Sequence, residues 1–261
     1  MSMYSSSIEG KVALITAAGA GIGRAIASEW ARHGGIAIVT DFDGEAAQDT
    51  LREIGEEHFA RQMDVSSLVS IRATVAEAIE MAGGVDALFN VAGVNLPKNV
   101  EEIDDEDWQR LLDTNLTSVY RCSKLVIPAL RKRGGGAIVN VASIAGVMAE
   151  NRCSAYSASK GGVVLLTRNM GMDFAKDNIR VNAVCPGATL TPRIRSYMDS
   201  EPEHRKEMEE MCPMRRFAEP IEIARPALFL ASSDASYITG ASLVVDGGLT
   251  AGFRIAAFDR M

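Results

Sequence analysis

The stretch KVALITAAGAGIGRAIA, residues 11–27, decides the fold of this 261-residue chain. Residues 11–16 form a short apolar run, and Gly19, Gly21 and Gly23 follow where the pattern changes to that of a helix. Glycines at such a turn let backbone N–H groups approach a phosphate, and the helix N-terminus favours its negative charge. The stretch therefore predicts a strand, a phosphate-binding turn and a helix.

The same alternation of a short apolar run and a longer helical segment recurs along the whole chain, without a linker or an internal repeat. The expected strands are residues 11–16, 35–40, 58–65, 85–93, 136–143, 180–187 and 242–248. Continuous apolar strands separated by helices indicate a parallel sheet that is covered on both faces. Right-handed crossovers then make it doubly wound. We predict an α/β chain: a single-domain Rossmann fold over residues 1–261, with a seven-stranded parallel sheet and helices on both faces.

Composition excludes several functional classes. The net charge of −7 and the absence of a long basic cluster argue against a nucleic-acid partner. No run reaches transmembrane length and the N-terminus lacks a signal pattern, so we expect no membrane association and a cytoplasmic location. Four separated cysteines without a C-x-x-C spacing indicate reduced thiols. The three histidines, at positions 33, 58 and 204, lie in polar segments that we expect to be exposed, and we expect no metal site.

Asp41 follows the second apolar run, about 20 residues after the glycine turn. A carboxylate at this place is expected to bind the ribose hydroxyls of an adenosine, and it would repel a 2′-phosphate, so NAD is favoured over NADP. Asp41 and Asp43 could instead cap the next helix. The position at the end of a strand favours the ribose role for Asp41.

Tyr156 and Lys160, in SAYSASKGG at residues 154–162, are four positions apart among small residues. On a helix these positions share one face, so both side chains can approach one site. A cation near a phenol lowers the phenol pKa toward neutrality, which would make Tyr156 a general base. An amphipathic surface helix often shows the same spacing.

Together these residues resemble the short-chain dehydrogenase/reductase family over essentially the whole chain. Thr16 to Gly23 matches the family's cofactor turn except at Ala17, where glycine is usual and a methyl group is tolerated if φ stays negative. Asp64-Val65, NVAG at residues 90–93 with Val91 in place of asparagine, Asn115 and SIAG at residues 143–146 are similar to further family signatures. PGATLT at residues 186–191 and YITGASLVVDGG at residues 237–248 complete the pattern.

The resemblance implies an NAD-dependent oxidoreductase with Asn115, Ser143, Tyr156 and Lys160 as catalytic residues. Tyr156 would exchange a proton with the substrate hydroxyl, and Lys160 would lower the tyrosine pKa and hold the nicotinamide ribose. Ser143 would stabilise charge on the substrate oxygen, and Asn115 would hold a water that links Lys160 to solvent. The residues expected to bind NAD are Thr16, Gly19, Gly21, Ile22, Gly23, Asp41, Phe42, Asp64, Val65, Asn90, Ala92, Gly93, Tyr156, Lys160, Pro186, Gly187, Thr189 and Thr191.

Substrate choice is expected to come from the segments after residues 93, 143 and 187, the last of which, residues 188–218, is predicted to be a lid. The candidate substrate-binding residues are Asn95, Ser143, Glu150, Arg152 and Arg193. They favour a small polar substrate such as a sugar, polyol or cyclic diol, with or without an anionic group, and a place in carbohydrate metabolism. A 3-oxoacyl-thioester reductase, and a dinucleotide-binding regulator without turnover, are the alternatives.

The small residues around Lys160, such as Gly161 and Gly162, permit a close approach by another helix. Since the family usually pairs this helix between subunits, we expect a homotetramer or a dimer. The same small residues would also suit packing within one subunit. The tail FRIAAFDRM, residues 253–261, could reach a neighbouring subunit's site.

Overall fold

The computed structural model of the chain describes residues 5–252, so the tail that begins at residue 253 lies outside the described residues. Seven strands form one parallel sheet in the order β3-β2-β1-β4-β5-β6-β7. They are β1 Val12–Ile15, β2 Ile36–Asp41, β3 Phe59–Gln62, β4 Ala87–Asn90, β5 Gly136–Val141, β6 Ile179–Pro186 and β7 Ser242–Val245. The predicted Rossmann fold and all seven predicted strands are confirmed; five strands are shorter than the apolar runs suggested, and β2 and β6 are shifted by one residue.

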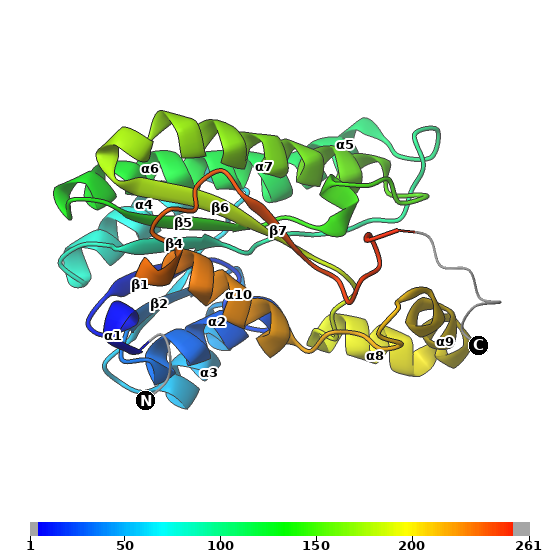
Figure 1. Ribbon diagram of the computed structural model, residues 1–261, viewed down its shortest axis with the longest axis horizontal. Coiled ribbons are helices and arrows are strands. Elements are labelled where there is room, and N and C mark those ends of the chain that lie inside the picture. Colours follow the sequence, from blue (N-terminus) through cyan, green and yellow to red (C-terminus); the bar gives the residue numbers. More distant parts are fainter. Residues whose placement is uncertain (1–4, 253–261) are drawn as a thin grey trace.

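Helices cover both faces of this sheet (Figure 1). On one side lie α4 Leu68–Met81, α5 Asp105–Leu112, α6 Ser118–Lys132 and α7 Ser154–Asp173, and on the other α1 Ser5–Ile8, α2 Gly21–Arg32, α3 Gly44–Ile54 and α10 Pro220–Ala231. Because apolar side chains of the central strands point alternately to the two sides, each helical layer shares a separate apolar core with the sheet. This explains why the strand sequences are apolar without alternation.

Polar side chains mark where the helices begin. Asp43, Ser67 and Asp104 accept hydrogen bonds from the first backbone N–H groups of α3, α4 and α5.

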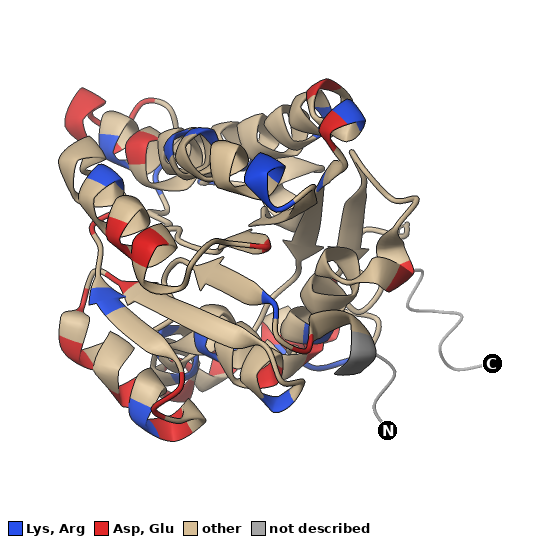
Figure 2. Ribbon diagram, turned by 90° about the vertical axis from the view of Figure 1, so that its left-hand side faces the viewer, with Lys and Arg blue, Asp and Glu red and all other residues tan. Residues whose placement is uncertain are grey.

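Lys, Arg, Asp and Glu alternate over the outer helices rather than gathering by sign (Figure 2). None of the described helices combines the length and the apolar composition needed to cross a bilayer.

The strand order reverses between β1 and β4, and ligands of such sheets bind beside the carboxyl ends of the strands at this place. Thr16, directly after β1, connects the end of this strand to the segment after β4. Its Oγ1 accepts hydrogen bonds from the N–H groups of Val91 at 2.9 Å and Ala92 at 3.1 Å. A crevice is thus expected at this edge, between the glycine turn after β1 and the NVAG segment after β4.

The structure corrects the expectation for two of the three histidines. His33 is 4% exposed and His58 is 5% exposed, and burial lowers the pKa of both rings. The His58 Nδ1 atom accepts a hydrogen bond from the Ala37 N–H at 3.2 Å, so the ring satisfies a backbone donor of β2. Between residues 5 and 252, no cluster of three or more His, Cys, Asp or Glu side chains is placed to hold a metal ion.

Candidate active site

The glycine turn after β1 fits a dinucleotide phosphate. Gly21 has a φ of +56°, and α2 begins there after Ala20, which provides no side-chain cap. The first N–H groups of α2 therefore remain for an anionic ligand. A Cβ atom at Gly19 would lie 2.8 Å from the Asp41 carboxylate, so the backbone can approach that side chain only because residue 19 is glycine.

Asp41 lies at the end of β2, and its Oδ2 accepts a hydrogen bond from the Gly19 N–H at 2.9 Å, while its Oδ1 accepts one from the Asp43 N–H at 3.0 Å. The helix cap of α3 belongs to Asp43, whose Oδ1 accepts from the N–H groups of Glu45 and Ala46. The two aspartates thus have different roles. Asp41 faces the glycine turn, and its role in ribose binding stays a prediction.

Ala17 departs from the expectation made for it. Its φ is +51°, not negative, so this alanine adopts the left-handed conformation in which glycine is favoured. The turn keeps its shape because the Ala18 N–H donates to the Thr40 carbonyl at 2.9 Å and the Thr16 N–H to the Phe89 carbonyl at 3.0 Å.

The remaining residues predicted to bind the cofactor lie around the same edge of the sheet, with one qualification for Asn90. The Asn90 side chain is 4% exposed, and its Nδ2 donates to Asn140 Oδ1 at 2.8 Å and to Ser123 Oγ at 3.3 Å. The side chain of Asn90 therefore ties β4 to β5 and α6. Asp64 Oδ1 accepts from the N–H and the hydroxyl of Ser66 in the turn after β3.

The structure brings together the predicted catalytic residues at the carboxyl end of β5. Ser143 follows the strand and Tyr156 lies in the first turn of α7, where a hydrogen bond with Ser143 acts on the phenol. Lys160 lies one turn further on, with its Nζ 5.9 Å from the centre of the Tyr156 ring. The amine and the phenol therefore face one site, as their spacing predicts.

Lys160 is 3% exposed, and its Nζ donates a hydrogen bond to the Val141 carbonyl at 2.8 Å. A Cβ atom at Gly93 would lie 3.1 Å from this Nζ, so the glycine of NVAG leaves the space that the amine occupies. Burial lowers the pKa of Lys160 to about 8. The amine is thus held in place by backbone rather than by a carboxylate.

The expectation that the pKa of Tyr156 falls toward neutrality is wrong for the protein's own groups. Burial of the phenol raises its pKa, the hydrogen bond with Ser143 lowers it in part, and the charges of Glu150 and Cys153 raise it further. The phenol is therefore protonated at neutral pH unless additional positive charge binds beside it.

Asn115 lies in a π-helical turn, Asp113–Thr117, between α5 and α6. It is fully buried; its Oδ1 accepts from the Val94 N–H at 2.8 Å, and its Nδ2 donates to the Val94 carbonyl at 2.9 Å and to Ser159 Oγ at 3.0 Å. Such turns often occur at functional sites. Asn115 thus joins the segment after β4 to α7 beside Lys160, and the water that it is expected to hold stays a prediction.

Sequence reasoning missed Ser159 and Glu102, which are hydrogen-bond partners of the predicted site residues Asn115 and Arg152. Ser159 lies next to Lys160 and bonds to Asn115, and its place in the quoted stretch was a signal for it. Glu102 accepts two hydrogen bonds from the Arg152 guanidinium, at 2.9 and 2.7 Å, although it lies 50 residues away in the sequence. The Arg152 side chain is therefore engaged within the protein, whereas Arg193 is exposed on the lid.

Glu150 and Cys153 lie close enough to Tyr156 for their charges to act on its phenol, and Asn95 lies beside Cys153. We call these three polar side chains, Asn95, Glu150 and Cys153, the substrate wall. Asn95 Nδ2 lies 3.8 Å from Cys153 Sγ. Burial and the negative charge of Glu150 raise the pKa of the Cys153 thiol. The wall is thus polar and, at Glu150, negatively charged.

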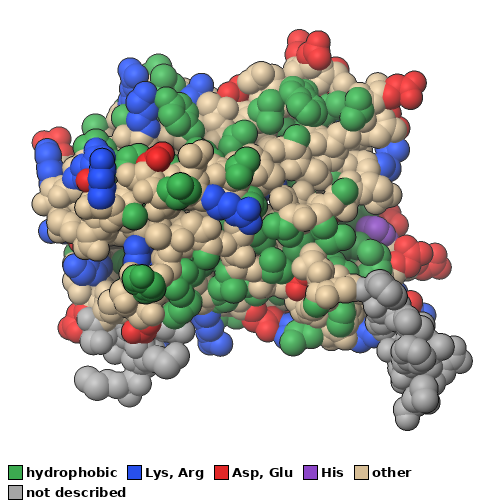
Figure 3. Space-filling model, turned by 45° about the horizontal axis from the view of Figure 1, so that its top comes forward, with side chains coloured by type: hydrophobic (Ala, Val, Ile, Leu, Met, Phe, Trp, Pro, Cys, Tyr) green, Lys and Arg blue, Asp and Glu red, His purple; other side chains and the backbone are tan. Residues whose placement is uncertain are grey.

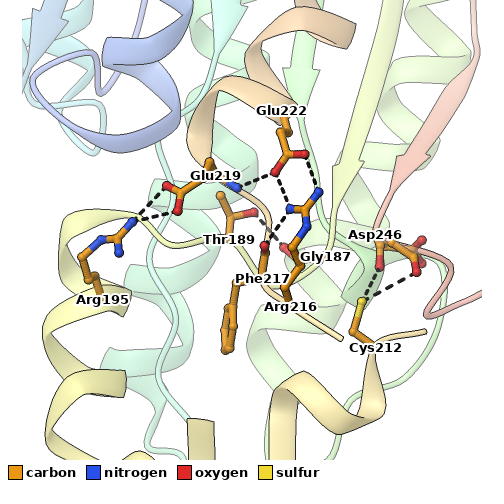
Figure 4. A network of polar contacts seen from close by, with 10 residues as sticks. Gly187, Thr189, Arg195, Cys212, Arg216, Phe217, Glu219, Glu222 and Asp246 are labelled. Carbon is orange, nitrogen blue, oxygen red and sulfur yellow. Dashed lines mark hydrogen bonds and ion pairs between the residues drawn. The ribbon is translucent and has the colours of Figure 1, made fainter. Parts of the chain in front are cut away.

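The predicted lid contains α8 Pro192–Ser200 and α9 Pro202–Met211, which project from the body of the molecule (Figure 1). Its two ends pair with each other, because the Leu190 N–H donates to the Ala218 carbonyl at 2.8 Å and the Ala218 N–H to the Ala188 carbonyl at 2.9 Å. Arg195 pairs with Glu219 and Arg216 pairs with Glu222, both at the start of α10 (Figure 4).

This segment, whose role as a lid stays a prediction, also has an apolar cluster of its own and a third attachment. Leu190, Met198 and Phe217 are buried together, packed against Ala188, Ile194 and Met208. Cys212 Sγ donates to the carbonyl of Asp246 after β7, at 3.6 Å (Figure 4). All four cysteines of the chain are buried free thiols.

Comparisons with known proteins agree with this geometry. Residues 16–250 match the model of a family described as enoyl-(acyl carrier protein) reductase. Cyclohexanol dehydrogenase of Acinetobacter sp. (strain SE19) is 38% identical over 252 residues, which are 95% of this chain and 98% of that protein. The chain belongs to the short-chain dehydrogenase/reductase family.

Two solved structures of this family resemble the chain closely. A 7 alpha-hydroxysteroid dehydrogenase complexed with NADH and 7-oxo glycochenodeoxycholic acid has a TM-score of 0.88 and 37% identity, covering 93% of this chain and 95% of that one. A 3-ketoacyl-(acyl-carrier-protein) reductase from Brucella melitensis, complexed with NADH, has a TM-score of 0.87 and 35% identity, covering 94% and 100%.

As a short-chain dehydrogenase/reductase, the chain is an oxidoreductase that acts on CH–OH groups. Members of the family use NAD(H), and both of these solved structures hold NADH. The glycine turn, the uncapped start of α2 and the Asp41 carboxylate fit it. The enzyme class leaves no support for the alternative of a regulator without turnover.

Proposed function

We propose that the chain is an NAD-dependent dehydrogenase that interconverts a secondary alcohol and a ketone in a small polar molecule, such as a polyol, a sugar or a cyclic diol. The observation that carries this proposal is the meeting of Ser143, Tyr156 and Lys160 at the end of β5 beside the cradle formed by the glycine turn and Asp41. The polar substrate wall supports a hydroxylated substrate. The negative charge of Glu150 and the pairing of Arg152 with Glu102 favour a neutral substrate over an anionic one.

The side chains divide the proton chemistry between them. When bound, NAD(H) supplies the acceptor or donor of the hydride. The Ser143 hydroxyl donates a hydrogen bond to the substrate oxygen and stabilises its developing charge. The Tyr156 oxygen takes the hydroxyl proton during oxidation and returns it during reduction. The Lys160 ammonium stabilises negative charge on that oxygen from the Val141 carbonyl at which it is fixed.

A substrate panel tests the proposed activity. With NAD, we expect polyols, sugars or cyclic diols to give a higher kcat/KM than hydroxy acids or hydroxysteroids, because the substrate wall offers polar partners and no free cation. The measurement is the rise of NADH absorbance. A hydroxysteroid or a hydroxy acid as the best substrate would contradict the polar, neutral assignment.

A 3-oxoacyl-thioester reductase is the second candidate, and the Brucella melitensis structure supports it. That reductase is complexed with NADH. A preference for NAD set by Asp41 is therefore compatible both with an alcohol dehydrogenase and with a thioester reductase. Reduction of acetoacetyl thioesters with NADH separates them. If the thioester is reduced faster than any ketone of the panel, the second candidate replaces the first.

The preference for NAD over NADP is tested at Asp41. We expect Asp41→Ala to narrow that preference by about 1–3 kcal/mol, the usual cost of losing a buried polar pairing, because no carboxylate remains to bind the ribose or repel a 2′-phosphate. The ratio of kcat/KM with the two cofactors measures it. Asp43→Ala is the matched control, since it removes a neighbouring carboxylate that only caps α3. An equal change in both variants would refute the role of Asp41.

We further propose that the chain assembles as a homotetramer or a dimer. Large apolar side chains are exposed on α6 and α7, among them Tyr120, Leu165 and Met172, and on the edge strand β7 at Leu243 and Val244. Figure 3, which turns the side with α6 and α7 toward the viewer, shows hydrophobic side chains gathered in several places on this face. Light scattering gives the mass in solution, and a monomer at micromolar concentration would contradict the assembly.

A further inference from the structure

Two loops meet beside the first turn of α7. One follows β4 and includes residues 94–103, and the other leads into α7 and includes residues 147–153. Arg152, near the end of the second loop, has a φ of +57°, in the left-handed region that favours glycine. A non-glycine residue keeps such a conformation only where its surroundings hold it, and strained residues of this kind gather at functional sites.

Glu102 of the first loop holds Arg152. The Nη1 and Nη2 atoms of Arg152 donate to the two carboxylate oxygens of Glu102 at 2.9 and 2.7 Å. This paired geometry fixes direction as well as distance, and the hydrogen bond from Arg152 lowers the pKa of Glu102. Glu102 is itself fixed, because Asn99 Oδ1 accepts hydrogen bonds from the N–H groups of Glu101 and Glu102.

The first loop has two further attachments. At its start, Val94 is bound through its N–H and its carbonyl to the Asn115 side chain. In its middle, Lys98 forms a backbone bridge with Cys153, and its Nζ donates to Asp107 of α5 at 2.7 Å. The pair of Glu102 and Arg152 therefore fixes the C-terminal end of this loop. Its start and middle are already bound to Asn115 and to Cys153, which precedes α7.

We propose that Glu102 and Arg152 are a positioning pair that holds the substrate wall against Tyr156. Tyr156 lies four residues after Arg152, while Asn95 and Cys153 of the wall lie on the two joined loops. Arg152 thereby acts on Glu102 instead of binding an anionic group of the substrate. This inference rests on the proposed dehydrogenase activity, for which Glu102 and Arg152 would fix the position of the substrate wall.

The pair is tested by removing the charge of Glu102 alone. We expect Glu102→Gln to lower kcat/KM for the best alcohol roughly 10- to 100-fold, because misplacement of a substrate-positioning group by about 1 Å costs up to that much. The increase in KM should exceed the fall in kcat, and the Kd for NADH should not change. Glu77→Gln is the matched control, since it breaks a similar exposed pair with Arg61 (Nε to Oε1 2.7 Å) away from these loops.

Two substitutions at Arg152 separate positioning from stability. Arg152→Gly removes the pair but also relieves the backbone conformation, so it should lose turnover as Glu102→Gln does while unfolding at no lower temperature than the wild type. The exchanged pair, Glu102→Arg with Arg152→Glu, should recover most of the activity that each single substitution loses. Full turnover in Arg152→Gly, or no recovery in the exchanged pair, would overturn the proposal. So would a loss in Arg152→Ala that is confined to anionic substrates.

Hydrogen exchange tests the pair without any substrate. Glu102→Gln should speed amide exchange in residues 94–103 and 147–153 together, and Glu77→Gln should not. Unchanged exchange in both loops would overturn the pair. If no alcohol of the panel is oxidised but the exchange result holds, the proposed function fails and the coupling of the loops stands.

Discussion

Tyr156→Phe should lower kcat about 10²–10⁴-fold while the variant still binds NADH, because the substitution removes only the hydroxyl that exchanges a proton with the substrate. The ring itself remains, together with its packing against Lys160. Turnover by NADH absorbance and NADH binding by fluorescence measure the two effects separately. A variant with near-normal kcat would show that another group carries the proton.

The matched control for this variant is Tyr120→Phe. Tyr120 and Lys124 have the same spacing on α6, and the Lys124 Nζ donates to the Tyr120 hydroxyl at 3.0 Å. That pair is exposed and lies outside the crevice, so its loss should leave kcat unchanged. Since burial raises the pKa of Tyr156, oxidation by the wild type should also accelerate as the pH rises from 6 toward 8.

Lys160→Met should lower kcat about 10²–10³-fold, the usual effect of removing a preorganised group that stabilises developing charge. The same substitution has a measurable effect on stability. Lys124→Met, which removes the exposed lysine of the second tyrosine–lysine pair, is the control for both readouts and should change neither by a comparable amount.

The effect on stability depends on pH in a defined direction. Burial lowers the pKa of Lys160 to about 8, and the pKa of an unfolded lysine is about 10.4. Between these two values the unfolded chain binds more protons than the folded one, so the free energy of unfolding of the wild type rises with pH in this window. Measured without cofactor, any stability advantage of Lys160→Met at pH 7 should shrink by about 3 kcal/mol by pH 10. A pH-independent difference between the two proteins would contradict a lysine that is charged and buried at neutral pH.

The two tyrosine–lysine pairs show how much of the site could be predicted from the sequence. Spacing alone describes Tyr120 with Lys124 as well as Tyr156 with Lys160, and only the surrounding motifs separate them. In the structure the exposed Lys124 lowers the pKa of Tyr120, whereas burial dominates at Tyr156. The position of Tyr156 could be predicted, but the direction of its pKa shift could not, because desolvation depends on neighbours distant in the sequence.

The fold was predictable for a simpler reason. The central strands are buried on both sides, so their apolar runs are visible without any knowledge of their partners. Asp41 and the glycine turn were predictable because both lie within one strand–helix–strand unit. The pairing of Arg152 with Glu102, the left-handed conformation of Ala17 and the burial of His58 depend on contacts across the fold, which no local pattern contains.

The apolar cluster of Leu190, Met198 and Phe217 has a consequence for engineering. These side chains pack on one another and on residues of the same segment, and the ends of the segment pair with each other. The segment can therefore be exchanged as a unit for that of a homologue, with the Glu219 and Glu222 attachments retained. Chimeras made in this way would acquire new specificity without redesign of the scaffold beneath.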